Sequence, residues 1–423
     1  MLLKAAHYVM VAAYVGLPIA AIAWDIARAA KGKRAAPSSS LIMTFFAAVA
    51  IGAGLSVIYA LAVGGAVRVT QVLLAIYFAF SLLLILKVLD ALVTRLGARA
   101  VARFARGDVK PLRRRSVIAA AVLGRWIVLF AIGLPYVMAS VLTYRPKVRA
   151  LEDPVDRLGF VYEPIEFRAT DGTHLSGWWI PGQPDARADD TERAAMRTVI
   201  ICHGLGANKS NHVILAQALV PAGYNVLIFD FRAHGSSGGQ LASFGDLERH
   251  DVLGAVRWVR ANRPEQAQEI FGVGASMGAA ALLAAAAEPS ADGRAIAAVA
   301  VYGTYDDLAD MAGTVAQRFP PPVNWLVRHV GMPMASLQTG TNLADFSPAR
   351  CAQQIWPRPI LVIHGVQDEI IDFEHGQRLF NAASPPRSRI WVQQGSHNSI
   401  VDDQQTADDV RRFFNEARAM PVI

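Results

Sequence analysis

The segment Gly274–Gly278 combines a serine with two glycines in the pattern Gly-Ala-Ser-Met-Gly. The apolar residues 269–273 before it predict a short strand, and the alanine- and leucine-rich residues 278–288 after it predict a helix. A serine at such a corner stands above the sheet, and the flanking glycines let neighbouring backbone pass close to a strained turn. The pattern therefore indicates Ser276 as a nucleophile.

The same glycines also fit a rival pattern. Gly272, Gly274 and Gly278 have the spacing of a loop that binds a dinucleotide. That fingerprint opens the first strand–helix unit of its domain, whereas these glycines lie in the middle of the alternating pattern described next. We therefore favour the nucleophile and expect no cofactor.

From Glu152 onward, strand-like and helix-like segments alternate. Residues 162–168 and 175–180 predict a β-hairpin joined through a turn at 170–172. Apolar strands that alternate with helices favour a parallel sheet covered on both faces. The further strands are predicted at 198–202, 225–230, 269–273, 296–302, 359–364 and 389–392, with helices that begin near Ser210, Asp246, Met277, Asp372 and Asp402.

Residues 303–358 are too many for a simple connection between two strands. They include three methionines, Trp325 and a run of three prolines. We predict that this segment forms a cap over the site.

The two cysteines give no disulfide framework. Cys202 ends a predicted buried strand and is expected to be a packed free thiol, while a Cys202–Cys351 disulfide is the less favoured alternative. No group of Cys and His has the spacing of a metal site, so we expect no metal.

Residues 162–414 resemble an α/β-hydrolase of the branch that contains monoglyceride-lipase-like and serine-aminopeptidase-like enzymes. The resemblance implies an α/β fold with a doubly wound, mostly parallel sheet, a cap insertion and the chain order Ser, Asp, His. Ala233 stands where the family usually has glycine. The matching motifs are His203–Gly206 after a strand, the loop Asp230–Ser237, the corner Gly274–Gly278, Asp368 after a strand, and His397 in Gly-Ser-His-Asn.

The resemblance implies a catalytic triad of Ser276, His397 and Asp368. A serine hydroxyl is a poor nucleophile until a base takes its proton. His397 follows the last predicted strand, where its loop can fold back over the serine. Asp368 would bind the other ring nitrogen and stabilise the imidazolium. The backbone N–H groups of Leu205 and Met277 would bind the oxyanion, an effect worth about two to three powers of ten per donor.

Other titratable residues compete for these roles. His234 is an alternative base, although it precedes the serine and so departs from the expected order. Glu369 and Asp372 compete with Asp368 for the role of the acid. We expect His203 to orient the oxyanion loop and His364 to be a buried, hydrogen-bonded histidine.

Charge is distributed unevenly along the 423 residues. Residues 1–142 hold 16 Lys and Arg against three Asp and Glu, whereas the remaining residues hold 25 against 31. The overall charge of +7 therefore belongs to the first third, and it does not indicate a protein that binds nucleic acid. A basic part joined to an acidic part instead favours a membrane region followed by a soluble domain.

Four apolar stretches in the first third are long enough to cross a bilayer. Basic residues follow the first stretch, which favours a retained anchor over a signal peptide cleaved near residues 21–23. The stretches are 5–24, 41–63, 69–89 and 125–142.

Lysine and arginine in the connections predict the orientation. Residues 28–40 hold four of them and residues 95–115 hold eight. Loops rich in these residues stay in the cytoplasm. We therefore expect an integral membrane protein, in a bacterial inner membrane, with the hydrolase domain on the extracytoplasmic side.

Together these patterns predict a four-helix transmembrane region at residues 1–144 and an α/β-hydrolase domain at 152–423. We expect a membrane-anchored serine hydrolase that cleaves an ester or thioester of acyl or lipid type. The alternatives are a serine peptidase, for which Asp306 and Asp307 offer a carboxylate pair that could bind a substrate amine, and a scaffold without catalytic activity.

Overall fold

The computed structural model describes residues 134–144, 147–150, 152–183, 196–318, 321, 323–399 and 403–417, and a few positions between 44 and 83. The predicted membrane segment 5–24, nearly all of 41–63 and 69–89, and the first half of 125–142 lie outside the described residues. Within the described part, no helix has both the length and the apolar character needed to cross a membrane. The chain divides into two compact units, Met1–Leu134 and Pro135–Ile423, and the second contains the residues discussed below.

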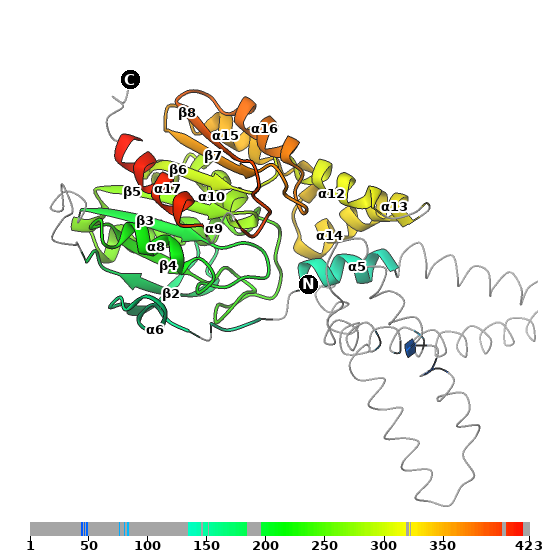
Figure 1. Cartoon of the computed structure of the whole chain (residues 1–423). Coiled ribbons are helices and arrows are strands. Elements are labelled where there is room, and N and C mark those ends of the chain that lie inside the picture. Colours follow the sequence, from blue (N-terminus) through cyan, green and yellow to red (C-terminus); the bar gives the residue numbers. More distant parts are fainter. Residues whose placement is uncertain are drawn as a thin grey trace, which may run out of the picture. The chain divides into compact units, whose positions relative to one another are not determined.

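An eight-stranded sheet forms the centre of the second unit, with the strand order β1-β2-β4-β3-β5-β6-β7-β8 (Figure 1). Strand β2 pairs antiparallel with β1 and with β4, and the other pairs are parallel. The prediction of a hairpin followed by a mostly parallel sheet is therefore confirmed. The strands are β1 (Glu163–Arg168), β2 (His174–Ile180), β3 (Arg197–Cys202), β4 (Asn225–Phe229), β5 (Glu269–Ala275), β6 (Ile296–Tyr302), β7 (Ile360–Gly365) and β8 (Arg387–Val392).

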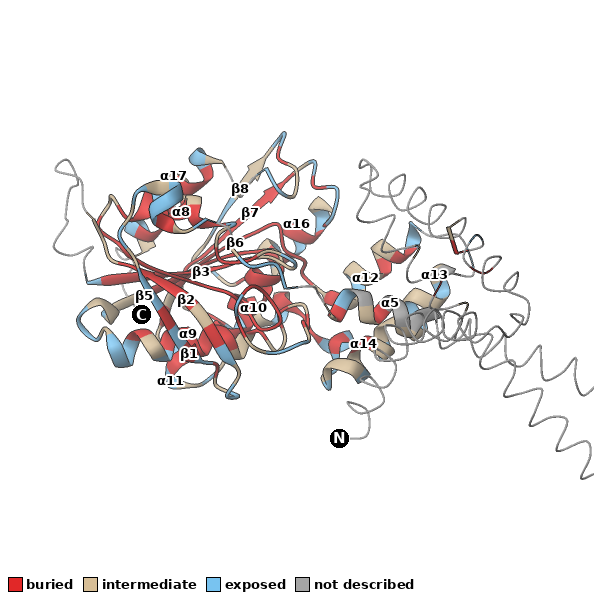
Figure 2. Ribbon diagram, turned by 90° about the horizontal axis from the view of Figure 1, so that it is seen from below, coloured by how far each residue is buried: buried red, intermediate tan, exposed pale blue. Residues whose placement is uncertain are grey.

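Helices cover both faces of this sheet, so its central strands are buried (Figure 2). Side chains of a strand alternate between the two faces. Accordingly, Val199 and Ile201 pack with α8 (Val213–Leu219) and α17 (Gln404–Ala417). Ile200 and Cys202 lie in the opposite cluster, which includes side chains of α9 (Arg249–Asn262), α10 (Met277–Ala287) and α16 (Phe373–Ala382). Cys202 is buried and free, as predicted.

The segment between β6 and β7 folds as a series of helices (Figure 1). Part of it packs against the sheet domain, since Ala352 lies in the same apolar cluster as residues of α10 and α16. The limits of the cap, 303 and 358, remain a prediction. The elements are α12 (Leu308–Gln317), α13 (Val323–Leu326), the π-helical η3 (Val327–Gly331), α14 (Met332–Thr339), η4 (Leu343–Asp345) and α15 (Pro348–Gln354).

Helix α5 (Leu134–Thr143) contacts the cap. Ala139 is buried in an apolar cluster with residues of α10, α12 and α14. The Thr143 hydroxyl lies 2.9 Å from Oε1 of Gln338 in α14, and Nε2 of Gln338 donates to the Ser140 hydroxyl at 2.7 Å. The sequence placed these residues at the end of a membrane segment, and the structure shows that they also pack within the second unit. Short helices complete this unit: α6 (Pro154–Leu158), η2 (Glu265–Ala267) and α11 (Ala291–Arg294).

Candidate active site

Ser276 lies at the corner between β5 and α10, as the sequence predicts. Its backbone φ angle is 49°, a value that residues other than glycine rarely adopt and that marks a strained position. Its N–H donates to the Tyr302 carbonyl at 2.9 Å, and its carbonyl accepts from the Thr304 hydroxyl at 2.9 Å. A Cβ atom on Gly278 would lie 2.4 Å from the Cys202 carbonyl oxygen, so this turn requires glycine there. Contacts with the ends of β3 and β6 therefore hold the corner.

His397 and Asp368 form a hydrogen-bonded pair. Nδ1 of His397 lies 2.8 Å from Oδ2 of Asp368. The other oxygen, Oδ1, accepts the N–H groups of Ile370 and Ile371 at 2.9 Å each. Burial acts to raise the pKa of Asp368, but the bonds from His397, Ile371 and Ile370 outweigh burial and lower that pKa below its ordinary value. Asp368 is thus an ionised, buried carboxylate that orients the imidazole.

Gly303 places this pair beside the serine corner. A Cβ atom on Gly303 would lie 3.4 Å from Nδ1 of His397 and 3.6 Å from Oδ2 of Asp368. The residues on either side of Gly303 are those that bond the backbone of Ser276. Among the described residues, no hydrogen bond joins the Ser276 hydroxyl to His397. Such bonds often tighten only when substrate binds.

The loop after β3 lies against the serine. A Cβ atom on Gly204 would lie 3.5 Å from the Cβ of Ser276. Within the described part of the chain, the N–H of Leu205 has no hydrogen-bond acceptor. Met277 is the first residue of α10, a position whose N–H has no acceptor inside the helix. Both N–H groups predicted for the oxyanion hole are therefore available.

Asp230 is the first residue of the motif Asp230–Ser237, and its side chain joins this motif to the loop after β3. Its buried carboxylate accepts the Lys209 N–H at 2.8 Å, the Lys209 ammonium at 3.0 Å and the Ser236 N–H at 2.9 Å. Gly235 has a φ of 48°, and a Cβ atom there would meet the Asp230 carboxylate. Ala233 has a φ of 61°, which explains why the family usually has glycine at this position.

The competing acids have other contacts. Glu369 accepts the backbone N–H of His397 at 3.3 Å and so contacts the loop rather than the ring. Asp372 precedes α16 and lies 3.7 Å from Arg318. Among the three candidates, Asp368 is thus the carboxylate that bonds the imidazole.

The other predicted histidines also contact the site. Nε2 of His203 accepts the Phe231 N–H at 3.0 Å, which fits the predicted role in orienting the loop. Nε2 of His364 lies 3.0 Å from the Ile371 carbonyl and 3.5 Å from Oδ2 of Asp368. His234 bonds backbone groups through both ring nitrogens, so neither nitrogen is free to take the proton of Ser276. His212 also contacts the loop, and no sequence motif marked it.

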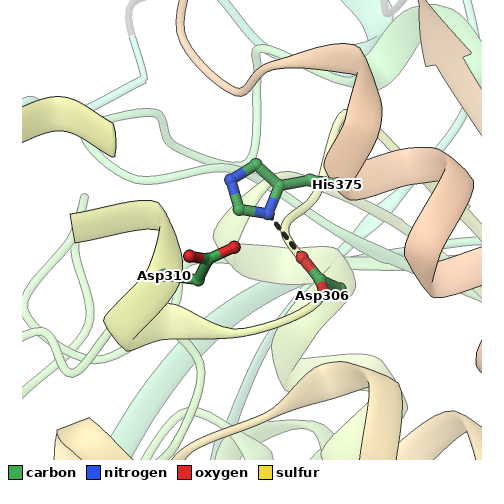
Figure 3. A group of neighbouring side chains, drawn as sticks. All are labelled: Asp306, Asp310 and His375. Atoms are coloured by element: carbon green, nitrogen blue, oxygen red, sulfur yellow. Dashed lines mark hydrogen bonds and ion pairs between the residues drawn. The ribbon is translucent and has the colours of Figure 1, made fainter. Parts of the chain in front are cut away.

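Asp306, Asp310 and His375 form a second polar cluster, shown in Figure 3. Nδ1 of His375 lies 2.5 Å from Oδ1 of Asp306. The Arg378 guanidinium is within 3.0 Å of both carboxylates and 2.8 Å from His375. Arg378 therefore already supplies the positive charge that a metal ion would bring to these ligands.

Comparison with known proteins agrees with the fold. The sequence model of the serine aminopeptidase family S33 matches residues 193–350. The uncharacterized protein YfhR of Escherichia coli O157:H7 is 30% identical over 242 residues, which cover 57% of this chain and 75% of that protein. An esterase of Pyrococcus furiosus, Pf2001, superimposes with a TM-score of 0.51 at 25% identity, covering 65% of this chain and 98% of the esterase. The chain belongs to the α/β-hydrolase family.

Proposed function

We propose that this protein is a serine hydrolase that cleaves an ester or thioester. The observation that carries the proposal is the bonded pair of His397 and Asp368 beside Gly303, whose two neighbours hold the strained corner at Ser276. The structural similarity to an esterase supports the same reaction class. The fold alone would not, because it serves many reactions.

In the proposed mechanism, the Ser276 oxygen attacks the carbonyl carbon of the substrate while Nε2 of His397 takes the hydroxyl proton. The N–H groups of Leu205 and Met277 bind the negative oxygen of the tetrahedral intermediate. The intermediate collapses when His397 gives the proton to the leaving alcohol or thiol. Water then attacks the acyl-enzyme with His397 again as base, which releases the acid and restores Ser276.

Active-site labelling tests this proposal. The full-length protein is treated with a fluorophosphonate and assayed with p-nitrophenyl esters of graded chain length. We expect labelling at Ser276 that is lost in Ser276→Ala, and turnover that falls by several powers of ten in Ser276→Ala and His397→Ala. Asp368→Asn should do less damage than His397→Ala. Full ester turnover in Ser276→Ala would contradict the assignment of the nucleophile, and the absence of any labelling would favour a scaffold without activity.

We also propose that the chain is anchored in the bacterial inner membrane, with the hydrolase unit outside the cytoplasm and an acyl or lipid ester as its substrate. Support comes from the four apolar stretches and the basic loops of the sequence. Alkaline phosphatase fused at residue 150 should be active, and a fusion near residue 110 should be silent. The reverse pattern would place the hydrolase unit in the cytoplasm.

A serine peptidase is the second candidate, favoured by the match to the serine aminopeptidase family. The predicted carboxylate pair does not support it, because Asp306 bonds His375 and Arg378, and Asp307 caps α12. A panel of aminoacyl amides, assayed beside the esters, distinguishes the two activities.

A further inference from the structure

Two imidazoles bind the N–H groups on either side of Leu205. The Gly204 N–H donates to Nε2 of His212 at 3.3 Å, and the Gly206 N–H donates to Nε2 of His234 at 3.0 Å. The N–H between them belongs to Leu205, the residue that the proposed function assigns to the oxyanion hole. Both neighbouring peptide groups are thus fixed by side chains from outside the loop.

The ring of His234 is held from both sides. Because Nε2 accepts a hydrogen bond, the neutral ring carries its proton on Nδ1. That proton is donated to the Arg232 carbonyl at 2.8 Å. Arg232 in turn bonds the buried Asp251 through its backbone N–H at 2.8 Å and its guanidinium at 2.6 Å. A buried ion pair therefore fixes the histidine that fixes Gly206.

His212 makes a hydrogen bond to the described residues through one ring nitrogen and none through the other. It precedes α8 and is 6% exposed. In the described part of the chain, its Nδ1 is buried without a hydrogen-bond partner, and the bond from Gly204 is the one hydrogen bond of its side chain. A buried donor without an acceptor destabilises the folded protein. An apolar side chain would avoid that penalty but could not accept the Gly204 N–H.

We propose that His212 and His234 are positioning residues of the oxyanion hole. This inference rests on the proposed function. The two rings accept the N–H groups of Gly204 and Gly206 and hold the loop in the conformation that leaves the Leu205 N–H free for the oxyanion. Neither ring touches the reacting atoms. An oxyanion donor stabilises the transition state more than the bound substrate, so loss of its position lowers kcat and leaves KM nearly unchanged.

The test compares substitutions that keep or remove the acceptor. In the full-length protein, His234→Phe removes it, whereas His234→Gln offers a carbonyl oxygen at about the reach of Nε2. With p-nitrophenyl acetate we expect kcat to fall about 100-fold in His234→Phe, with KM within about twofold, and to recover at least about tenfold in His234→Gln. His212→Phe and His212→Gln should differ in the same direction. The matched control is His250→Phe, since His250 bonds the Thr170 hydroxyl and not the loop.

Hydrogen–deuterium exchange of residues 203–207 gives a second measurement that needs no activity. The Gly206 amide should exchange faster in His234→Phe and at the wild-type rate in His234→Gln. Wild-type kcat and wild-type exchange in both phenylalanine variants would overturn the inference. So would a loss of kcat that glutamine does not restore and that comes with a lower melting temperature. Fluorophosphonate labelling of the wild-type protein separates these results from failure of the proposed function itself: without labelling at Ser276, the function and this role fall together.

Discussion

At the scale of single residues, the site depends on backbone conformations that residues other than glycine rarely adopt. Ser276 and Ala233 both have positive φ angles, and they lie in two loops that meet at the oxyanion loop. At Ser276 the conformation has a chemical reason, since it exposes the hydroxyl above the sheet. At Ala233 the side chain contributes no polar atom to the loop, so the strain there has no evident compensation.

Ala233→Gly should therefore stabilise the protein by about 1 kcal/mol, because glycine adopts positive φ without the steric penalty of a Cβ atom. Urea unfolding of the two proteins measures the difference. The matched control is Ala312→Gly in the middle of α12, which should destabilise by about 1 kcal/mol. A destabilised Ala233→Gly would show that the Ala233 conformation is not strained in solution.

His212 should make stability depend on pH. Burial lowers its pKa to about 4, whereas in the unfolded chain it titrates at the ordinary value of 6.5. As pH falls below about 6.5, the unfolded state takes up a proton that the folded state does not, so stability is lost until pH reaches about 4. The loss from this residue is about 3 kcal/mol over that window.

Urea unfolding at pH 7, 6 and 5 checks this expectation against His212→Gln, which cannot titrate. The free energy of unfolding should fall more steeply in the wild type than in the variant. Equal slopes would mean that His212 titrates normally in the folded protein. The comparison isolates His212 from other buried histidines, such as His203 and His364, whose pKa values burial also lowers.

At the scale of elements, the site forms where strand ends meet helix starts. The start of α10 lies very close to the end of β3, where Gly278 faces the carbonyl oxygens of Cys202 and His203. A side chain here would push the helix that follows Ser276 away from the loop that carries the proposed oxyanion donor, Leu205. Backbone atoms cannot yield as a flexible side chain can.

Gly278→Ala should consequently destabilise the protein by about 3 kcal/mol and lower ester turnover. Gly331→Ala is the matched control, because Gly331 has helical angles and a Cβ atom there would lie 3.8 Å from its nearest neighbour. That control should be neutral or slightly stabilising. Thermal unfolding of both variants decides the matter, and similar melting temperatures would contradict the close packing of α10 on β3.

The strands and the site loops could be predicted because their signals are local. Apolar strands, turn residues and the motif at Gly274–Gly278 all lie within short segments of sequence. Contacts between distant segments leave no such signal. His212 acts through a bond to Gly204 that depends on how α8 packs, and Asp306 meets His375 only after the chain has folded. Hydropathy also cannot separate a helix in lipid from one buried by protein, which is why the contact of α5 with the cap was missed.

At the scale of the whole molecule, the chain joins a basic, apolar first third to an acidic hydrolase unit. Helix α5 ends the predicted membrane region in sequence and packs against the cap. Its Ala139 shares an apolar cluster with Ile371, three residues after Asp368, and with side chains of α10. The second half of the last predicted membrane segment is therefore a helix that packs near the site.

A comparison of truncated chains tests whether the substrate comes from the membrane. The full-length protein and a chain that starts at Leu134, which keeps α5, are assayed with a short soluble ester and with a long-chain lipid ester in bilayers. If the first third holds the hydrolase unit at the lipid surface, its removal should lower lipid turnover far more than short-ester turnover, because the effective concentration of substrate falls. A chain that starts at residue 151 serves as a control for α5 and should melt at a lower temperature, since it exposes the cluster around Ala139. Equal losses on the two substrates for the chain that starts at Leu134, or no loss on either, would leave the first third as an anchor without a role in substrate supply.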